Sequence, residues 1–372
     1  MKILVLPRDA SPYQSLLYGE VRRLGVHVIY LGELTPVHTL NLLLLPLEVA
    51  ARRLAGARVL HLHWVFAFTL PGAPRFPAMR WVAQAWFLVV LRVCRALGMH
   101  LVWTAHNVLP HEPVFADDAS ARRALVEASD LVLVHSQSTL DELAALGAAP
   151  RRKAVIPHGP IGSPGAGGSL RTPGAGGDRP REFLFFGHVR EYKGVDDLLS
   201  AFLAVPDDVA ARLTIAGRCD DPRLRSRLRA LARRGGARVV LRLDHVPGDE
   251  VAQLLGGADV VVLPFRRVST SGSAMLALSH GRPLIVPDRG GLGDLPDRAV
   301  LRYDGDVAGL VDALVSLARA DAGTLAAMSA AARCYAYQTT WREIAERTVC
   351  EMLSMLGDVP RAGASGQPLR AP

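Results

Sequence analysis

The chain has 372 residues, half of them apolar, so it is long for one hydrophobic core and predicts two domains of ordinary size. Its formal net charge is +8, and residues 1–111 hold eleven Lys and Arg against four Asp and Glu, a balance of +7. Such a basic half suits an acidic partner such as nucleic acid, anionic lipid or phosphate, although a chain that places Arg wherever a solvated charge serves has the same composition.

The four cysteines are scattered without paired spacing, which argues against a zinc site or a disulfide framework and favours a reducing compartment. The chain opens with KILVL, an apolar run that predicts a first strand and is too short for the core of a signal peptide. No run of about 18 uncharged apolar residues occurs, so no membrane-spanning helix is expected. We therefore predict a cytoplasmic protein.

Short apolar or β-branched runs alternate with Arg-, Leu- and Ala-rich helical stretches along the chain. The predicted strands are KILVLP, VHVIYLG, VLHLHWV, HLVWTAHN, DLVLVHS and KAVIPHG, then EFLFFGHV, RLTIAGR, RVVLRLDHV, ADVVVLP, PLIVP and AVLRYD. Strands that alternate with helices predict parallel sheets covered on both faces. The predicted fold class is α/β, with two Rossmann-like parallel-sheet domains facing a cleft.

A stretch dominated by Gly and Pro separates the two sets of strands and predicts a flexible linker at 161–180. It leaves an N-terminal domain at 1–160 and a C-terminal domain at 181–357. The last residues, 358–372, have no apolar face to bury and predict a disordered tail.

An apolar stretch at 75–99 contains four arginines, two tryptophans and no acidic residue. A buried helix of the first domain explains it most simply. The alternative is an interfacial helix on anionic lipid, which would place the protein peripherally at the inner face of the cell membrane.

Two strand ends of the first half carry imidazoles. VLHLHW places His61 and His63 on one face of a strand, and TAHNVLPHE offers His106 and Glu112 after another. The three histidines could be read as a metal cluster, but no carboxylate or cysteine has ligand spacing beside them. A His or Glu at a strand end fits a general base better, and a buried, hydrogen-bonded core residue is the simpler alternative.

Two strand ends of the second half suit phosphate. In FFGHVREYKGV, Gly187 ends a strand and two long cations, Arg190 and Lys193, follow it. In VVLPFRRVSTSGSAML, small residues lie between a strand and a helix, where backbone N–H groups and the helix dipole favour an anion. The predicted diphosphate site consists of Gly187, Arg190, Lys193, Thr270, Ser271, Gly272 and Ser273. A solvated loop and an ordinary helix N-cap are the alternatives.

The sequence YDGD, with Asp304 and Asp306, resembles a paired-aspartate metal site but precedes a helical stretch, so we interpret it as a helix N-terminus. We predict no metal site and no cofactor.

As a set, these motifs resemble the two-domain glycosyltransferases of the GT-B fold. They are most similar to bacterial GDP-mannose:glycolipid 4-β-mannosyltransferases of exopolysaccharide synthesis. The resemblance rests on SPYQSLLY, VLHLHW, TAHNVLPHE, FFGHVREYKGV and VVLPFRRVSTSGSAMLALSHGRPLIVP, which occur in this order between about residues 11 and 290. It implies that the first domain binds a lipid-linked or oligosaccharide acceptor and that the second binds the donor, GDP-mannose.

The chain departs from the broad retaining families of this fold, in which two glutamates eight positions apart occupy this last motif. Val268 and Leu276 stand there instead. The resemblance therefore implies inversion, which needs a base to deprotonate the acceptor hydroxyl. We expect this base to be His106 first and Glu112 second, with Asp9 in reserve. The residues expected to contact acceptor or sugar are Asp9, Tyr13, His63 and Asn107.

Two other functions stay open at this stage. One is a retaining glycosyltransferase acting on a small natural product. The other is a nucleic-acid or nucleotide-binding protein without chemistry, which only the basic charge favours, because aromatic and basic residues do not interleave as base-stacking surfaces require. We therefore expect no nucleic-acid partner.

Overall fold

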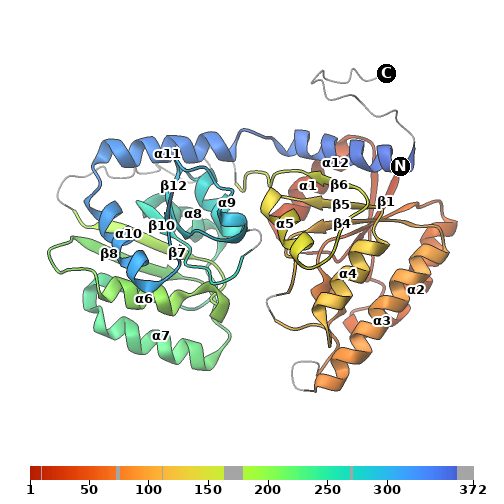
Figure 1. Ribbon diagram of the computed structural model, residues 1–372, viewed down its shortest axis with the longest axis horizontal. Coiled ribbons are helices and arrows are strands. Elements are labelled where there is room, and N and C mark those ends of the chain that lie inside the picture. Colours follow the sequence, from red (N-terminus) through yellow and green to blue (C-terminus); the bar gives the residue numbers. More distant parts are fainter. Residues whose placement is uncertain (10, 73–75, 111, 163–178, 269–270, 358–372) are drawn as a thin grey trace. The chain divides into compact units, whose positions relative to one another are not determined.

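The computed structural model describes residues 1–9, 11–72, 76–110, 112–162, 179–268 and 271–357. In them the chain forms two compact α/β units, each built on a six-stranded parallel sheet (Figure 1). The first unit comprises Met1–His135, Leu140–Pro157 and the chain from Trp341, and the second comprises Ser136–Thr139 and His158–Thr340. All twelve predicted strands are present, which confirms the α/β fold class.

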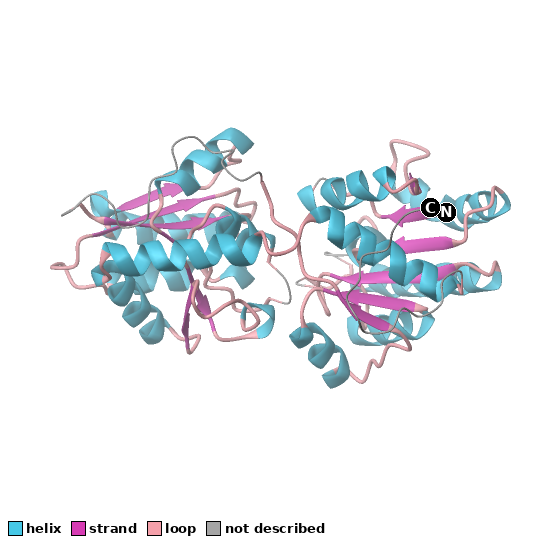
Figure 2. Ribbon diagram, turned by 90° about the horizontal axis from the view of Figure 1, so that it is seen from above, coloured by secondary structure: helices cyan, strands magenta, loops and turns pink. Residues whose placement is uncertain are grey.

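The sheet of the first unit has the strand order β2-β1-β3-β4-β5-β6. Its strands are β1 (Lys2–Leu6), β2 (His27–Tyr30), β3 (Val59–Leu62), β4 (His100–Ala105), β5 (Leu131–Val134) and β6 (Lys153–Val155). Its helices are α1 (Pro12–Arg23), α2 (His38–Leu54), α3 (Pro77–Ala96), α4 (Asp118–Ala128), α5 (Gln137–Ala145) and α12 (Trp341–Leu356). Because helices cover both faces of the sheet (Figure 2), β3 and β5 are buried at every position and read as unbroken apolar runs apart from His61.

The sheet of the second unit has the order β12-β11-β10-β7-β8-β9. Its strands are β7 (Arg181–Phe186), β8 (Ala211–Ala216), β9 (Val239–Arg242), β10 (Val260–Val262), β11 (Leu284–Pro287) and β12 (Val300–Tyr303). Its helices are α6 (Val195–Leu203), α7 (Pro222–Arg234), α8 (Gly248–Gly257), α9 (Gly272–Ser279), α10 (Val307–Arg319) and α11 (Ala322–Ala336).

Each sheet has one point at which the strand order reverses. In the first sheet it lies between β1 and β3, and in the second between β7 and β10. The connections that leave two such strands run in opposite directions, so the carboxyl ends of the strands stay open, and ligands of parallel α/β sheets bind there. The fold thus singles out the loops after β1, β3, β7 and β10.

The domain boundaries predicted from the sequence placed residues 341–357 in the second domain. In the structure, α12 packs against α1 in the first unit (Figure 1). Its apolar face joins the core under β1, with Ile344 and Met352 fully buried and Trp341 edge-on to Tyr13 at 5.4 Å between ring centroids. The predicted linker, 161–180, lies mostly in residues 163–178, and the predicted tail is 358–372; both of these segments lie outside the described residues.

We expect the burial of α12 to stabilise the first unit measurably. Ile344→Ala should lower its free energy of unfolding by about 2–5 kcal/mol, the usual cost of truncating a buried Ile. Arg342→Ala on the same helix is the control, because Arg342 is exposed and its pair with Glu346 at 2.9 Å should contribute only about 0.3–0.5 kcal/mol. Urea unfolding followed by tryptophan fluorescence reports on this unit alone, since it contains all five tryptophans. Equal losses in both variants would contradict a stabilising role for α12.

Candidate active site

Three residues predicted to bind diphosphate lie around one point at the end of β7. Gly187 has a φ of +133°, and a Cβ placed on it would lie 2.9 Å from Ser273 Oγ and 3.2 Å from Lys193 Nζ. Position 187 therefore requires glycine for its backbone conformation, and the ends of the Ser273 and Lys193 side chains lie beside it. The loop after β7 and the start of α9 thus meet beside the strand-order reversal of the second unit.

Backbone contacts hold these two loops together. Gly194 has a φ of +62°, and a Cβ there would lie 2.2 Å from the carbonyl oxygen of Pro264. The two backbone segments therefore touch without intervening side chains. Close by, the backbone N–H of Arg266 donates to the carbonyl of Tyr192 at 2.8 Å. The position of the loop after β10 is therefore tied to that of the loop after β7.

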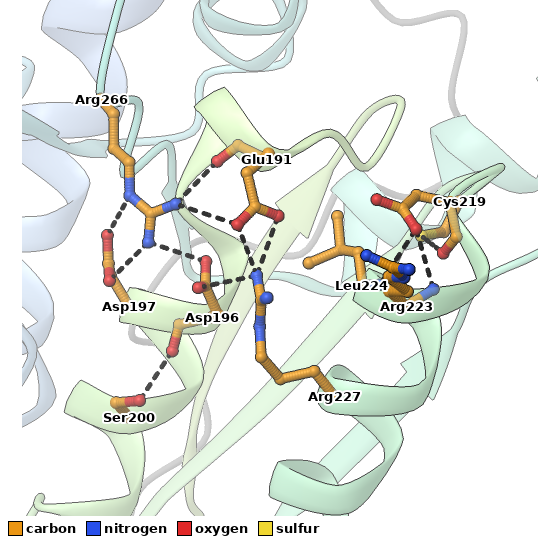
Figure 3. Close-up of polar contacts among 10 residues, drawn as sticks. Glu191, Asp196, Asp197, Ser200, Cys219, Arg223, Leu224, Arg227 and Arg266 are labelled. Carbon is orange, nitrogen blue, oxygen red and sulfur yellow. Dashed lines mark hydrogen bonds and ion pairs between the residues drawn. The ribbon is translucent and has the colours of Figure 1, made fainter.

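An ion-pair network reinforces this connection (Figure 3). The Arg266 guanidinium donates to both carboxylate oxygens of Asp197 at 2.8 Å, to Asp196 at 3.0 Å and to the Glu191 carbonyl at 2.9 Å. Arg227 of α7 binds Glu191 and Asp196 from the other side. These carboxylates, chiefly that of Asp197, raise the pKa of Arg266 above its usual value. Asp196 and Asp197 also lie in the first turn of α6, where the helix dipole favours negative charge.

Lys193 has a different environment. Its ammonium lies 5.0 Å from the centre of the Phe265 ring, and among the described residues no carboxylate forms an ion pair with it. Burial, with a smaller contribution from the positive charge of Arg190, lowers the pKa of Lys193 to about 8. Lys193 is one of only three lysines among 43 Lys and Arg. This partly buried cation is thus available to an anion beside Gly187.

The remaining predicted diphosphate residues have other partners, begin a helix or lie outside the described residues. The Arg190 guanidinium lies 3.9 Å from the Asp220 carboxylate, which also accepts a hydrogen bond from His188 at 2.8 Å. Ser271 is the N-cap of α9 and accepts from the N–H of Ala274 at 3.1 Å, so the N-cap interpretation holds for this hydroxyl. Gly272 begins the helix, and Thr270 lies outside the described residues.

In the first unit, the predicted imidazoles form one hydrogen-bonded chain with Tyr18 and Thr104. His106 Nε2 lies 3.0 Å from His63 Nδ1, and His63 Nε2 lies 2.6 Å from the Tyr18 hydroxyl. The same hydroxyl lies 2.8 Å from His61 Nδ1, and His61 Nε2 lies 2.7 Å from Thr104 Oγ1. All five side chains are buried, from 0% exposure at His61 to 7% at His106.

Aromatic rings surround His106 at one end of this chain. Trp64 stacks on it with centroids 4.3 Å apart and planes 13° apart, and Tyr13 meets it edge-on at 4.8 Å. His135 lies 5.2 Å from it. Burial lowers the pKa of His61 to about 3, and burial together with the neighbouring imidazoles lowers that of His63 well below its usual value. These two rings are therefore neutral at physiological pH.

The other predicted residues of the first unit, Asp9, Asn107 and Glu112, are not among the five members of this hydrogen-bonded chain. Asp9 follows β1, half-buried, and its backbone N–H donates to Gln14 Oε1 at 2.9 Å. Asn107, next to His106, is half-buried, whereas Glu112 is exposed. Glu112 therefore has the solvated environment of a surface carboxylate and not the buried one of His106.

The two candidate metal clusters have other roles. His61, His63 and His106 gather as the sequence indicated, but their ring nitrogens bind one another, Tyr18 and Thr104. Asp306 is the N-cap of α10 and accepts from Gly309 N at 2.7 Å, as interpreted from the sequence. In the part of the chain that is described, no group of three or more His, Cys, Asp or Glu could hold a metal ion.

Comparison with known proteins agrees with this arrangement. Residues 180–320 match the family described as glycosyl transferases group 1. Two GDP-mannose:glycolipid 4-beta-D-mannosyltransferases of Xanthomonas campestris pv. campestris are similar, one 29% identical over 62% of this chain and 61% of that protein, the other 27% identical over 81% of each. The alignment with the first relative thus spans less than two thirds of its length.

The chain has the GT-B fold, the two-domain architecture of solved glycosyltransferases. Sucrose-phosphate synthase from Thermosynechococcus elongatus has the same architecture, with a TM-score of 0.71, 19% identity and alignment over 96% of this chain and 99% of that one. The resemblance identified from the sequence motifs is thereby confirmed.

Several residues that contact the predicted site residues were missing from the sequence-based prediction. Tyr18 was part of a quoted motif but was not a candidate, and Thr104 and Arg266 were not singled out. The available signal for Tyr18 was its place on the buried face of α1 beside Tyr13 and Gln14, where polar groups need partners. Arg266 gave no such signal, because its partners lie about seventy residues earlier.

We expect Lys193 to titrate far below an ordinary lysine. Competitive labelling with acetic anhydride across a pH series should give a midpoint for Lys193 near pH 8, since burial disfavours its charged form. Peptide mass spectrometry resolves it readily because the chain has three lysines. The Lys193→Arg protein, which lacks the labelled amine, verifies the peptide assignment. A midpoint above pH 10 would show that the ammonium is solvated.

Proposed function

We propose that this glycosyltransferase moves mannose from GDP-mannose to a hydroxyl of a lipid-linked or oligosaccharide acceptor, with inversion and without a metal ion. The observation that carries the proposal is the convergence of Gly187, Lys193 and Ser273 at the strand-order reversal of the second unit. The names of the Xanthomonas relatives support the choice of donor and acceptor.

In this proposal the second unit stabilises the leaving nucleoside diphosphate. Lys193 supplies a compact positive charge, Arg190 a second cation, and Gly187 lets the phosphate approach the backbone. Asp196 and Asp197 pair with Arg266, and Asp196 also pairs with Arg227, which offsets their repulsion of a bound diphosphate. Cations placed where negative charge develops stabilise the transition state, often as the largest single contribution to catalysis.

The first unit supplies the base in this proposal. The acceptor O–H gives its proton to His106, the acceptor oxygen bonds to the anomeric carbon, and the bond from that carbon to the diphosphate breaks with its electron pair leaving on the diphosphate. Histidine suits this task because its ordinary pKa, about 6.5, lies near working pH. Asp9, Tyr13 and Asn107, at the same strand ends, contact the acceptor or the sugar.

We propose inversion because of the residues at two positions after β10, one in the loop and one in α9. Val268 and Leu276 are half-buried residues packed against the core of the second unit, and they stand where the retaining families that this chain resembles carry glutamates. Apolar side chains offer neither a nucleophile nor a charge for a retained linkage. The anomeric configuration of the product, read by NMR, decides between inversion and a retaining reaction.

Calorimetry with a panel of nucleoside diphosphates tests the donor site. The wild-type protein should bind GDP more tightly than UDP, and Lys193→Ala and Arg190→Ala should each weaken GDP binding by roughly 1.5–3 kcal/mol, the range for charge-assisted hydrogen bonds. Arg229→Ala is the matched control, since this arginine is exposed on α7.

Unchanged GDP affinity in both site variants would refute the assignment of the diphosphate site. Tighter binding of UDP would leave the site in place and change the donor. Turnover of the preferred nucleotide-sugar should persist in EDTA, and its loss in EDTA with recovery on adding Mg²⁺ or Mn²⁺ would contradict the metal-free reaction.

Enzyme kinetics test the assignment of His106 as the base. His106→Ala should lower kcat by about 10² to 10⁴, the usual contribution of general base catalysis, while GDP affinity stays unchanged. Glu112→Gln should have a much smaller effect because Glu112 is exposed. If neither substitution lowers kcat, the base lies elsewhere and Asp9→Asn becomes the decisive variant.

We further propose that the first unit associates peripherally with anionic membranes through one face, which we call the α2–α3 face. Exposed apolar side chains lie along both helices, which pack side by side (Figure 1). They are Leu40, Leu43, Leu47 and Leu54 on α2, with Phe76, Trp81, Val82 and Val89 at the start of α3 and along it. The two helices contain five arginines and one acidic residue, Glu48, which is buried. Among the described residues, none of the helices is long and apolar enough to cross a bilayer.

This proposal predicts binding to vesicles that depends on both charge and apolar contact. The protein should cosediment with phosphatidylglycerol-containing vesicles and not with pure phosphatidylcholine, and added salt should reduce the bound fraction because exposed charges are screened beyond about 8–10 Å. Leu47→Ser and Trp81→Ser should also reduce it, since both side chains are more than 60% exposed. Val240→Ser on the second unit is the control. Absence of binding at low salt would favour an acceptor that is not held in a membrane.

A further inference from the structure

His188 follows directly after Gly187 in the second unit, and its imidazole pairs with a carboxylate. His188 Nε2 lies 2.8 Å from Asp220 Oδ2. The Asp220 carboxylate also accepts a hydrogen bond from the guanidinium of Arg218. These two hydrogen bonds, chiefly that of Arg218, lower the pKa of Asp220 below its usual value. Asp220 is therefore ionised at neutral pH.

An ionised carboxylate can only accept hydrogen bonds, and this fixes one proton on the imidazole of His188. Nε2 must donate to Asp220 whether the ring is neutral or charged. The nitrogen that gains or loses a proton is therefore Nδ1. Within the described part of the chain no hydrogen bond involves this Nδ1, and the side chain is 40% exposed. Nδ1 is thus accessible to a ligand.

The sheet places this imidazole and the ammonium of Lys193 on opposite sides of the same strand. In the second unit β7 lies between β10 and β8. Lys193 Nζ lies 5.0 Å from the ring centre of Phe265, which follows β10. The partner of His188, Asp220, belongs to the loop between β8 and α7. His188 and Lys193 therefore flank the end of β7.

The loops after β7 and β8 also touch through their backbones. A Cβ on Gly217 would lie 2.0 Å from the carbonyl oxygen of Gly187, so no side chain separates the two loops there. Consecutive Cα atoms are about 3.8 Å apart, so the side chain of His188 starts close to the proposed diphosphate site. A diphosphate lying across the end of β7 would have one phosphate beside Lys193 and the other beside His188.

We propose that His188 is a contact of the donor's diphosphate, with its imidazolium oriented by Asp220 and donating from Nδ1 to a phosphate oxygen. The inference rests on the diphosphate site of the proposed function. In a neutral ring Nδ1 carries a lone pair, which would face the phosphate oxygen without a proton between them. Donor binding therefore favours the charged ring. Since histidine titrates near neutral pH, binding takes up a proton there, and donor affinity falls as the pH rises.

The charged groups near His188 come from two loops of the second unit. They are Arg218, Asp220 and Asp221 from the loop after β8, with Arg190 and Lys193 from its own loop. Asp221 is the N-cap of α7. Lys193 also titrates near neutral pH, because burial lowers its pKa to about 8. The contribution of His188 is therefore measured best below this value.

An exposed ion pair without a role in binding is the alternative, since such pairs contribute little to stability. The first unit contains a pair of this kind, in which His100 Nδ1 lies 3.7 Å from Asp130 Oδ2 and both side chains are 40% exposed. His100 begins β4, so it lies at the opposite end of the strand from the edge where ligands bind. His100→Gln is therefore the matched control.

Calorimetry in buffers of different ionisation enthalpy measures the protons taken up on binding. GDP-mannose is the probe because it has no phosphate monoester, whose second pKa of about 6 would obscure the measurement. At about pH 6.5, where an ordinary histidine titrates, the wild-type protein should take up a fraction of a proton that His188→Gln does not. His188→Gln should also bind about tenfold more weakly, because it lacks the charge-assisted hydrogen bond. His100→Gln should change neither quantity.

A second variant, His188→Arg, keeps a cation at every pH. Its affinity should match that of the wild-type protein at about pH 6.5 and exceed it at about pH 8, where an ordinary histidine is neutral. If the nucleotide panel selects UDP, UDP-glucose replaces GDP-mannose as the probe. Equal proton uptake in the wild-type protein and His188→Gln, or equal affinity at about pH 6.5, would overturn the role of His188.

The outcomes separate this inference from the diphosphate site itself. If Lys193→Ala weakens binding and His188→Gln does not, the site stands and the role of His188 fails. If neither variant changes the affinity, the diphosphate lies elsewhere and both proposals fail. If both variants weaken binding and only His188→Gln loses the proton uptake at about pH 6.5, both proposals are supported.

Discussion

Both units of the chain depend on the reversal of strand order within a parallel sheet. Between β1 and β3 in one unit, and between β7 and β10 in the other, neighbouring strands end at the same edge while their connections leave in opposite directions. Backbone N–H groups and side chains at those ends are thus left exposed to a ligand without any covering connection. The cluster around Lys193 lies beside one reversal and the imidazoles lie beside the other, so sheet topology selects the position of the chemistry before any side chain does.

The two sites then differ in electrostatics. In the second unit, carboxylates and guanidiniums pair with one another in the Arg266 network, and a partly buried ammonium remains without a carboxylate partner among the described residues. In the first unit, burial keeps the His61 and His63 rings neutral, and hydrogen bonds satisfy both of them. Fixed positive charge suits a leaving diphosphate, and neutral imidazoles suit a hydroxyl that must lose a proton. The proposed division of labour between the units follows from this difference.

Sequence patterns predicted the strands and their ends well, for a physical reason. Parallel strands buried on both faces are continuous apolar runs, and the candidate residues Gly187, Lys193 and His106 follow such runs directly, so the sequence could single them out. The position of α12 could not, because an amphipathic helix does not specify which of two apolar surfaces it covers. Tyr18, Thr104 and Arg266 were also missed, since each acts through a partner more than forty residues away that only the fold brings close.

The gradient of burial along the imidazole chain explains why His106 suits the proposed base. A proton accepted by any of the three rings creates a positive charge, and the cost of that charge rises with distance from solvent. His61 is fully buried with its pKa lowered to about 3, and His63 is 2% exposed with its pKa lowered well below the usual value. Protonation of either is thus unfavourable, so neither inner ring competes with His106 for the role of base that is proposed for it.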